Sequence, residues 1–110
     1  MPERQMLVVV VPVEIKDELV DTLMSLQLVS GFNMGRIAGF SREHSRFSLR
    51  ERVVGYRDLF RFEVVHALPD RAPLLDALEP VCAAVRSRYW IVPLLEEGHF
   101  GEKAGTESIQ

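Results

Sequence analysis

Apolar residues follow one another without interruption near the start of the chain, which is the pattern of a buried strand. Six of them occupy Met6 to Val11, and four of the six are valines. β-Branched side chains suit a pleated surface, and a run without polar alternation favours burial on both faces of a sheet. Pro12 ends the run. We therefore predict a strand over residues 6–11 that has apolar neighbours on both sides.

The pattern then changes to a helical period. Between Glu14 and Leu28, apolar residues recur every three or four positions. Acidic residues gather at the start of this stretch, where the helix dipole favours negative charge. Gly31 follows, as is common just past a helix end. The stretch predicts a helix whose apolar stripe consists of Ile15, Leu19, Leu23 and Leu26.

Two alternating segments come next, and each predicts a strand. Residues 31–40 alternate apolar and other residues, although three glycines weaken the pattern. Residues 59–66 alternate more regularly, with Phe60, Phe62 and Val64 on one face.

A second helix and a last strand complete the pattern. Asp70 suits the N-cap position, and apolar residues at helical spacing follow it. Pro80 removes an interior hydrogen bond, so we expect a kink or a break there. Residues 88–95 are apolar on both faces and predict a strand, with Pro93 at a sheet edge or a bulge. The helical stripe consists of Leu74, Leu75, Leu78, Val81, Cys82 and Val85.

The order of these elements predicts an α+β, ferredoxin-like βαββαβ fold. In this plan a four-stranded antiparallel sheet carries both helices on one face. The other face meets water in an isolated domain, yet here Trp90, Val92 and Leu94 make it apolar in the last strand. An exposed apolar face marks an interface. We therefore expect a homo-oligomer with closed symmetry, in which the pattern leaves dimer and trimer open.

The connection between the two middle strands, Ser41 to Arg57, is several times longer than a typical hairpin loop of about 2–5 residues. Its side chains suit an anionic ligand or an acidic protein surface, because guanidinium groups match carboxylate and phosphate. A solvated loop with no ligand is the alternative. Within it, Ser48-Leu49-Arg50-Glu51 has the spacing of a capping box and predicts one short helical turn. The candidate binding residues are Arg42, His44, Arg46, Arg50, Arg52 and Arg57.

Composition limits the classes of function. The chain has 110 residues and a net charge of −3, which suits one domain without general nucleic-acid affinity. We place that domain at residues 1–98 and expect a flexible tail at 99–110. Positive charge is concentrated: residues 41–61 hold six arginines and three acids (+3), against seven bases and thirteen acids (−6) elsewhere. No apolar run is long enough for membrane insertion, and a single cysteine fits a cytoplasmic protein without internal disulfides.

Other chemistry is weakly indicated. His44 and His99, the latter close to Glu96 and Glu97, are candidate ligands for a divalent metal. His66 fits a half-buried strand position, and Cys82 fits the core. No set of residues with catalytic spacing is present, so we do not expect an enzyme.

The capping-box residues 48–51, together with the ending Tyr89-Trp90 through Pro93 to Glu96-Glu97-Gly98, resemble a group of small bacterial PII-like proteins of unassigned function. Members of the group are similar in fold to the PII nitrogen-signalling proteins and to CutA, which are trimers. Their genes are often associated with heavy-metal efflux pumps. The resemblance implies a trimeric regulator whose loop 41–57 acts like the T-loop of PII.

The resemblance also implies a partner and a ligand. The partner would be a membrane transporter or another protein, and the ligand a nucleotide or a divalent metal. Two departures from PII bear on this. Residues 41–55 contain no tyrosine for modification, and residues 67–73 lack the glycines and lysine that hold nucleotide phosphates in PII. A CutA-like divalent-metal-binding protein is the alternative function.

Overall fold

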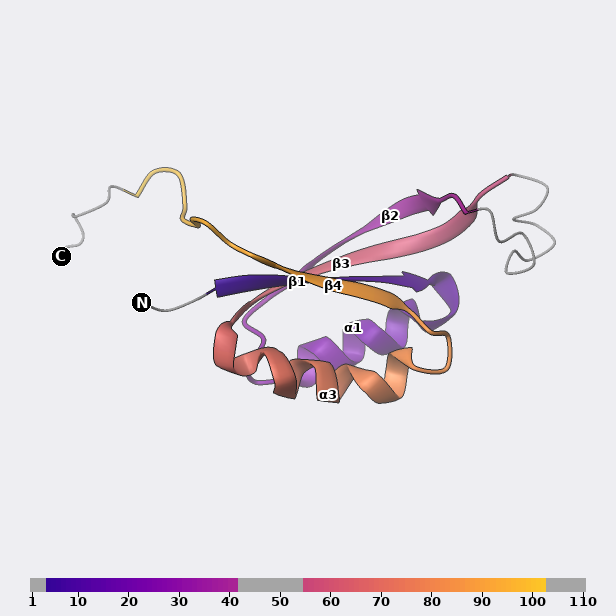
Figure 1. Ribbon diagram of the computed structural model, residues 1–110, viewed down its shortest axis with the longest axis horizontal. Helices are drawn as coiled ribbons and strands as arrows, with labels where there is room; N and C mark the ends of the chain where they lie inside the picture. Colours follow the sequence, from indigo (N-terminus) through magenta and orange to yellow (C-terminus); the bar gives the residue numbers. More distant parts are fainter. Residues whose placement is uncertain (1–3, 42–54, 103–110) are drawn as a thin grey trace.

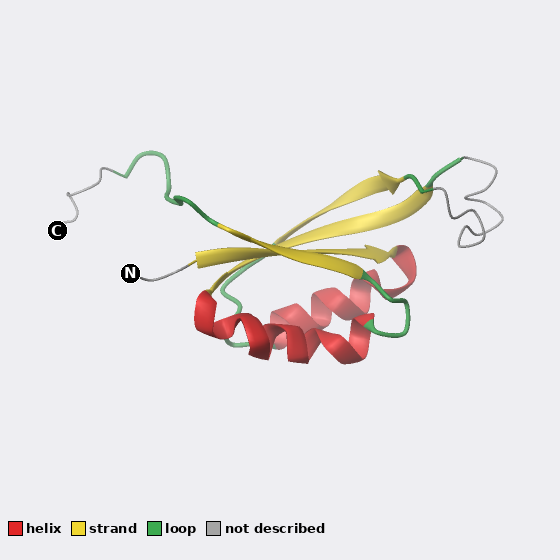
Figure 2. Cartoon of the chain, in the orientation of Figure 1, coloured by secondary structure: helices red, strands yellow, loops and turns green. Residues whose placement is uncertain are grey.

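The computed structural model describes residues 4–41 and 55–102, and it contains one sheet with two helices on one face (Figure 1). Among the described residues, Figure 2 shows no helix on the opposite face of the sheet. The main elements are β1 (Arg4–Pro12), α1 (Lys16–Ser25), β2 (Asn33–Gly39), β3 (Arg57–Ala67), α3 (Arg71–Cys82) and β4 (Arg88–Pro93). Short 3-10 turns at Val13–Ile15 and Leu68–Asp70 lead into the two helices.

The sheet has the strand order β2-β3-β1-β4, and every neighbouring pair is antiparallel. This arrangement confirms the predicted ferredoxin-like α+β fold. β1 lies between β3 and β4, as its uninterrupted apolar run predicts. β4 lies at an edge, which accommodates Pro93 because an edge strand leaves one side without ladder hydrogen bonds.

The core lies between the sheet and the helices. β1 contributes alternate residues to it, and the register places Val9 opposite Phe62 and Leu7 opposite Val64. The helices supply mainly leucines at helical spacing. All of these side chains are buried, and the set comprises Leu7, Val9, Val11, Leu19, Leu23, Phe62, Val64, Leu74, Leu78 and Val81.

The helix ends differ from the sequence prediction. α1 ends at Ser25 instead of Leu28, because Leu26 adopts an extended conformation (φ −87°, ψ 119°). Pro80 does not divide the second helix, since it lies in the last turn of a continuous α3. Neither helix has the length and hydropathy that a membrane crossing requires.

The face of the sheet without helices is only partly polar. Val8 lies on this face and is 0% exposed, with Glu63 and Trp90 as its cross-strand neighbours. The guanidinium groups of Arg61 and Arg88 lie 5.8 and 5.4 Å from the centre of the Trp90 ring. This geometry allows cation–π attraction, so the indole is flanked by two charges.

We expect replacement of Phe62 by alanine to lower the free energy of unfolding by about 3–5 kcal/mol, because it empties a fully buried site. Urea denaturation would measure the loss. Met24 is 73% exposed on α1, so Met24→Ala should change stability by no more than about 0.5 kcal/mol. Equal effects of the two substitutions would contradict the position of the core.

Candidate functional site

A groove of about 490 Å³ lies on the open face, where β2 ends and β3 and β4 begin. Ser41 and Arg57 line it, so the groove adjoins both ends of the long connection between β2 and β3. We call it the basal groove. Its lining consists of Val10, Pro12, Ile37, Gly39, Phe40, Ser41, Arg57, Leu59, Val85, Arg86, Ser87, Arg88 and Trp90.

Three arginines from two separate parts of the chain line the basal groove. Arg57 begins β3 and lies opposite Gly39 of β2. A Cβ atom at Gly39 would lie 2.4 Å from Leu59 Cδ1, so a larger residue there would force Leu59 to move. Arg86 and Arg88 come from the connection after α3 and from the first position of β4. The strand register therefore fixes two of the three arginines.

The backbone at Arg86 is unusual. Its φ is +52°, which places a side chain other than glycine in the left-handed region. Hydrogen bonds hold the turn: the Arg86 amide donates to Ala83 O (3.0 Å) and the Ser87 amide to Cys82 O (3.3 Å). This closure of the helix end is common with glycine, whereas arginine there costs on the order of 1 kcal/mol. Strained residues of this kind cluster at functional sites.

Two of the groove arginines, Arg86 and Arg88, differ from other arginines of the sheet in their partners. Arg4 pairs with Glu97, and Arg61 pairs with Glu63. Arg36 binds Asp58 through two guanidinium nitrogens, and this hydrogen bonding raises the pKa of Arg36. Within residues 4–41 and 55–102, neither Arg86 nor Arg88 has a carboxylate partner. These two guanidinium groups are therefore available to an external anion.

Most of the remaining lining is apolar. Val10, Pro12, Ile37, Leu59 and Trp90 form the wall beside the arginines. A site with apolar walls and a few charged groups is typical of small-molecule binding. Guanidinium groups select an anion, and an indole can pack against a planar or apolar part of it. The arrangement suits a small anion or an acidic side chain.

Among the loop residues that the sequence nominates, Arg57 reaches the basal groove, as the first residue of β3. It therefore belongs to a strand, two residues before the predicted strand start. Five of the candidates lie outside the described residues, as does the predicted helical turn at 48–51. These five are Arg42, His44, Arg46, Arg50 and Arg52.

Sequence reasoning missed Arg86 and Arg88. It looked for anion-binding residues at 67–73, which connect β3 to α3 and do not line the groove. The segment that does line it is the α3–β4 connection. The sequence did contain a sign of this segment, namely Arg-Ser-Arg at residues 86–88, between a helix and a strand.

The predicted interface residues lie at the β4 edge. Trp90 and Val92 are half-buried on the open face, and Trp90 also lines the basal groove. Leu94 follows β4, and its amide donates to Arg4 O at 3.0 Å. The three residues therefore form a line of apolar side chains along β4 and the residue after its end, which we call the apolar strip.

The predicted metal ligands are not brought together among the described residues. The exposed His99 ring lies 3.7 Å from the Glu102 carboxylate, while His44 is outside the described part of the chain. No group of three metal-ligating side chains occurs in residues 4–41 and 55–102. His66 is 2% exposed, more buried than predicted, and its Nδ1 lies 2.9 Å from Ala67 O.

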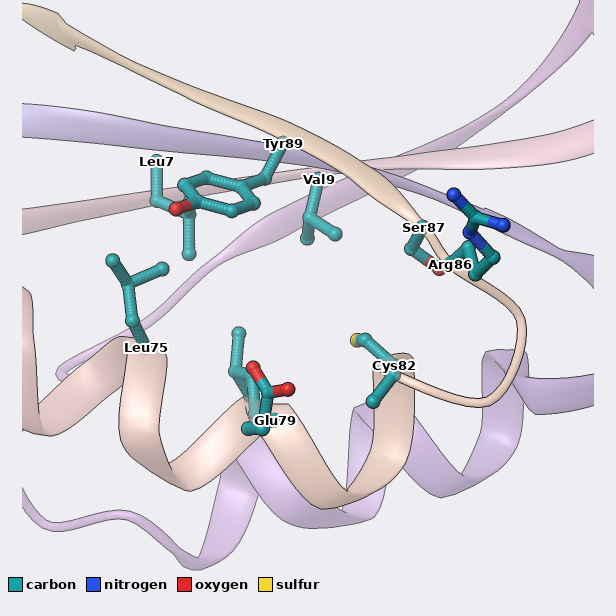
Figure 3. A pocket seen from close by; sticks show the side chains of 10 residues that line it. Leu7, Val9, Leu75, Glu79, Cys82, Arg86, Ser87 and Tyr89 are labelled. Atoms are coloured by element: carbon teal, nitrogen blue, oxygen red, sulfur yellow. The ribbon is translucent and has the colours of Figure 1, made fainter.

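A second hollow of about 380 Å³ lies between α3 and β4 (Figure 3). Core leucines and Val9 form much of its wall, and Tyr89 extends across it from β4. Cys82 is half-buried there, and burial raises the pKa of its thiol. The hollow has one arginine, Arg86, and is mainly an extension of the core. We regard the basal groove as the candidate functional site.

Comparisons with known proteins agree with the fold. A family model described as "Protein of unknown function (DUF3240)" matches residues 1–101. The crystal structure of a DUF3240 family protein from Shewanella baltica OS155 has 41% sequence identity and a TM-score of 0.75. That match covers 91% of this chain and 99% of the other. No curated protein is similar enough to match.

More distant solved structures share the fold alone. One is CPII, a nitrogen regulatory PII-like protein from Thiomonas intermedia K12 that is bound to ADP, AMP and bicarbonate. It has 13% identity and a TM-score of 0.63, and the match covers 90% of this chain and 98% of CPII. A Bacillus cereus protein related to NIF3 has 16% identity and a TM-score of 0.65, over 89% of this chain and 27% of that protein. The predicted PII-like fold is thus confirmed.

We expect Cys82 to react slowly with iodoacetamide in the folded chain. Burial raises its pKa, so a smaller fraction of the thiol is ionised at about pH 8 than in a free cysteine. The alkylation rate as a function of pH should have its midpoint above that of the same chain unfolded in urea. Coincident midpoints would contradict a buried thiol.

Proposed function

We propose that this chain, which belongs to the DUF3240 family of proteins of unknown function, is a non-enzymatic PII-like regulatory protein that binds an anionic ligand in its basal groove. The observation that carries the proposal is the convergence of Arg57, Arg86 and Arg88 on an apolar groove. Their position beside the long β2–β3 connection supports a role in signalling, because ligand and loop would then be in contact.

CPII offers a guide to the ligand class. The molecules bound to it, ADP, AMP and bicarbonate, are all anions. Phosphate and carboxylate-like groups are the partners that guanidinium binds through paired hydrogen bonds. A nucleotide would in addition place a planar base against the apolar wall, where Trp90 lies. We therefore propose an anion of this class as the ligand.

The regulatory step follows from charge. A bound anion neutralises positive charge between Ser41 and Arg57, the two ends of the connection. A bound anion thus changes the charge at the point where the connection joins the sheet, and this change is the signal that we propose. We propose that the basic side chains of residues 42–52 bind an acidic surface of a cytoplasmic partner. The family resemblance suggests a heavy-metal efflux transporter.

The alternative, a CutA-like metal-binding protein, has less support. It depends on His44 and His99, and the described residues place only one carboxylate beside His99. The same titration series can test it, with Zn²⁺ in place of the anion and His99→Ala as the variant.

We expect ADP, AMP or bicarbonate to bind the chain, as measured by isothermal titration calorimetry. Arg88→Gln and Arg86→Gln should each weaken binding about 10-fold or more, because a hydrogen bond to a charged group contributes about 1.5–3 kcal/mol. Arg71→Gln is the matched control, since Arg71 is exposed on α3 and outside the groove. Absence of binding for all three anions would contradict the ligand assignment.

We also propose that the protein is a homo-oligomer, a trimer by its resemblance, that buries Trp90, Val92 and Leu94. Val92→Arg would place a charge in this interface and should dissociate the assembly in sedimentation experiments. Met24→Arg is the control on the helical side, where Met24 is exposed. A wild-type chain that sediments as a monomer would refute the proposal.

A further inference from the structure

Residues 94–102 follow β4 and lead away from the sheet in a curved segment with a turn at residues 100–101 (Figure 1). We call it the carboxyl-terminal arm. Two of its large apolar side chains have no cover at all: Leu95 is 103% exposed and Phe100 is 109% exposed. Two fully exposed apolar side chains within five residues of each other are unfavourable in water and indicate a surface that is covered in an assembly.

The root of the arm is fixed on its own chain. The Leu94 amide donates to Arg4 O at 3.0 Å, and Arg4 Nε donates to a Glu97 carboxylate oxygen at 2.7 Å. These contacts tie the arm to the start of β1. They leave Glu96 without an ion-pair partner within the described part of the chain. The arm therefore presents Glu96, Leu95 and Phe100 outward.

The basal groove lies at the other end of the same strand. β4 begins at Arg88, in the groove, and ends five residues later at Pro93, opposite Gln5. At about 3.3 Å per residue, the two ends are roughly 17 Å apart. The arm continues away from the groove (Figure 1), so it does not fill the groove of its own chain.

The arm and the groove are complementary in both charge and polarity. The groove offers Arg86 and Arg88, for which the described residues supply no carboxylate, beside an apolar wall. The arm offers Glu96 together with Leu95 and Phe100. We infer that the arm of one copy docks in the basal groove of a second copy, with Glu96 toward the two arginines and the apolar side chains against the wall.

This contact joins different surfaces of two identical chains. Such a head-to-tail contact gives a ring where the rotation between copies closes and an open filament where it does not; the proposed contact takes the closed form, a discrete cyclic oligomer. The carboxylate–guanidinium pairs would fix the register, and the apolar side chains would exclude water around them. The arm would occupy the arginines and the apolar wall that the proposed anion uses, so arm and anion compete for the groove. The contact does not depend on the anion, so it stands even if no anion binds.

Charge reversal tests the contact through the association constant, measured by sedimentation equilibrium. Glu96→Arg and Arg88→Glu should each weaken assembly by about 10-fold or more, which corresponds to about 1.4 kcal/mol. The two substitutions in one chain should restore much of the loss, because the pair is reversed rather than removed. Asp76→Arg and Arg71→Glu are matched controls on exposed positions of α3 and should leave assembly unchanged.

The double variant Leu95→Ser, Phe100→Ser tests the apolar side chains of the contact between arm and groove. Both side chains are fully exposed in one chain, so the folded monomer should keep its stability while assembly weakens. Weaker assembly in this variant without any effect of Arg88→Glu would show that the arm docks elsewhere and overturn the assignment. Unchanged assembly in all variants, or a monomeric wild-type chain, would also overturn it.

Crosslinking shows directly which residues meet. One population carries Glu96→Cys and a second, of different mass, carries Arg88→Cys, both with Cys82→Ala. After mixing, a short bismaleimide should join a chain of one population to a chain of the other. Replacing the first population with Asp76→Cys should abolish the product. Crosslinking no more efficient than this control would contradict the inference.

Discussion

The rest of the structure depends on one constraint, the burial of β1 on both faces between two antiparallel neighbours. Leu7, Val9 and Val11 face the helices, while Val8 is fully buried on the other side. Because β1 is apolar on both faces, its hydrophobic pattern alone does not fix its register. The ladders with β3 and β4 fix it, and they place Val10 opposite both Arg61 and Arg88. The position of the groove is thus a consequence of the pairing of β1 on both sides.

The basal groove shows how a site can be formed at a strained turn. The turn that follows α3 holds Arg86 in the left-handed region, where glycine would be more stable. The turn brings the guanidinium of Arg86 to the same groove as that of Arg88. In a regular strand, residues two apart lie on one face, but Arg86 precedes β4 and lies in the turn. Its position therefore depends on the conformation of that turn. Strain at this position is the cost of placing both charges together.

Much of the fold could be predicted from the sequence, because it depends on local patterns. The valine run of β1, the leucine spacing of the helices and Pro93 at an edge strand each reflect a rule that acts within a few residues. The end of α1 at Ser25 was missed, since Leu26 leaves the helix while the apolar spacing continues. The groove was missed for a similar reason. Arg86 and Arg88 become neighbours of Arg57 only through the pairing of β1 with both β3 and β4, which no local pattern contains.

The molecule has chemically different ends along β4, and this polarity limits how copies can associate. An arm with Leu95, Glu96 and Phe100 lies at one end, and an arginine-lined groove at the other. Pairing like ends would place arginines beside arginines in a partly apolar site, which is unfavourable because each charge loses water without gaining a partner. Pairing unlike ends brings the Glu96 carboxylate to Arg86 and Arg88. Electrostatics thus favours head-to-tail association, and the apolar strip along β4 would then continue from one copy to the next.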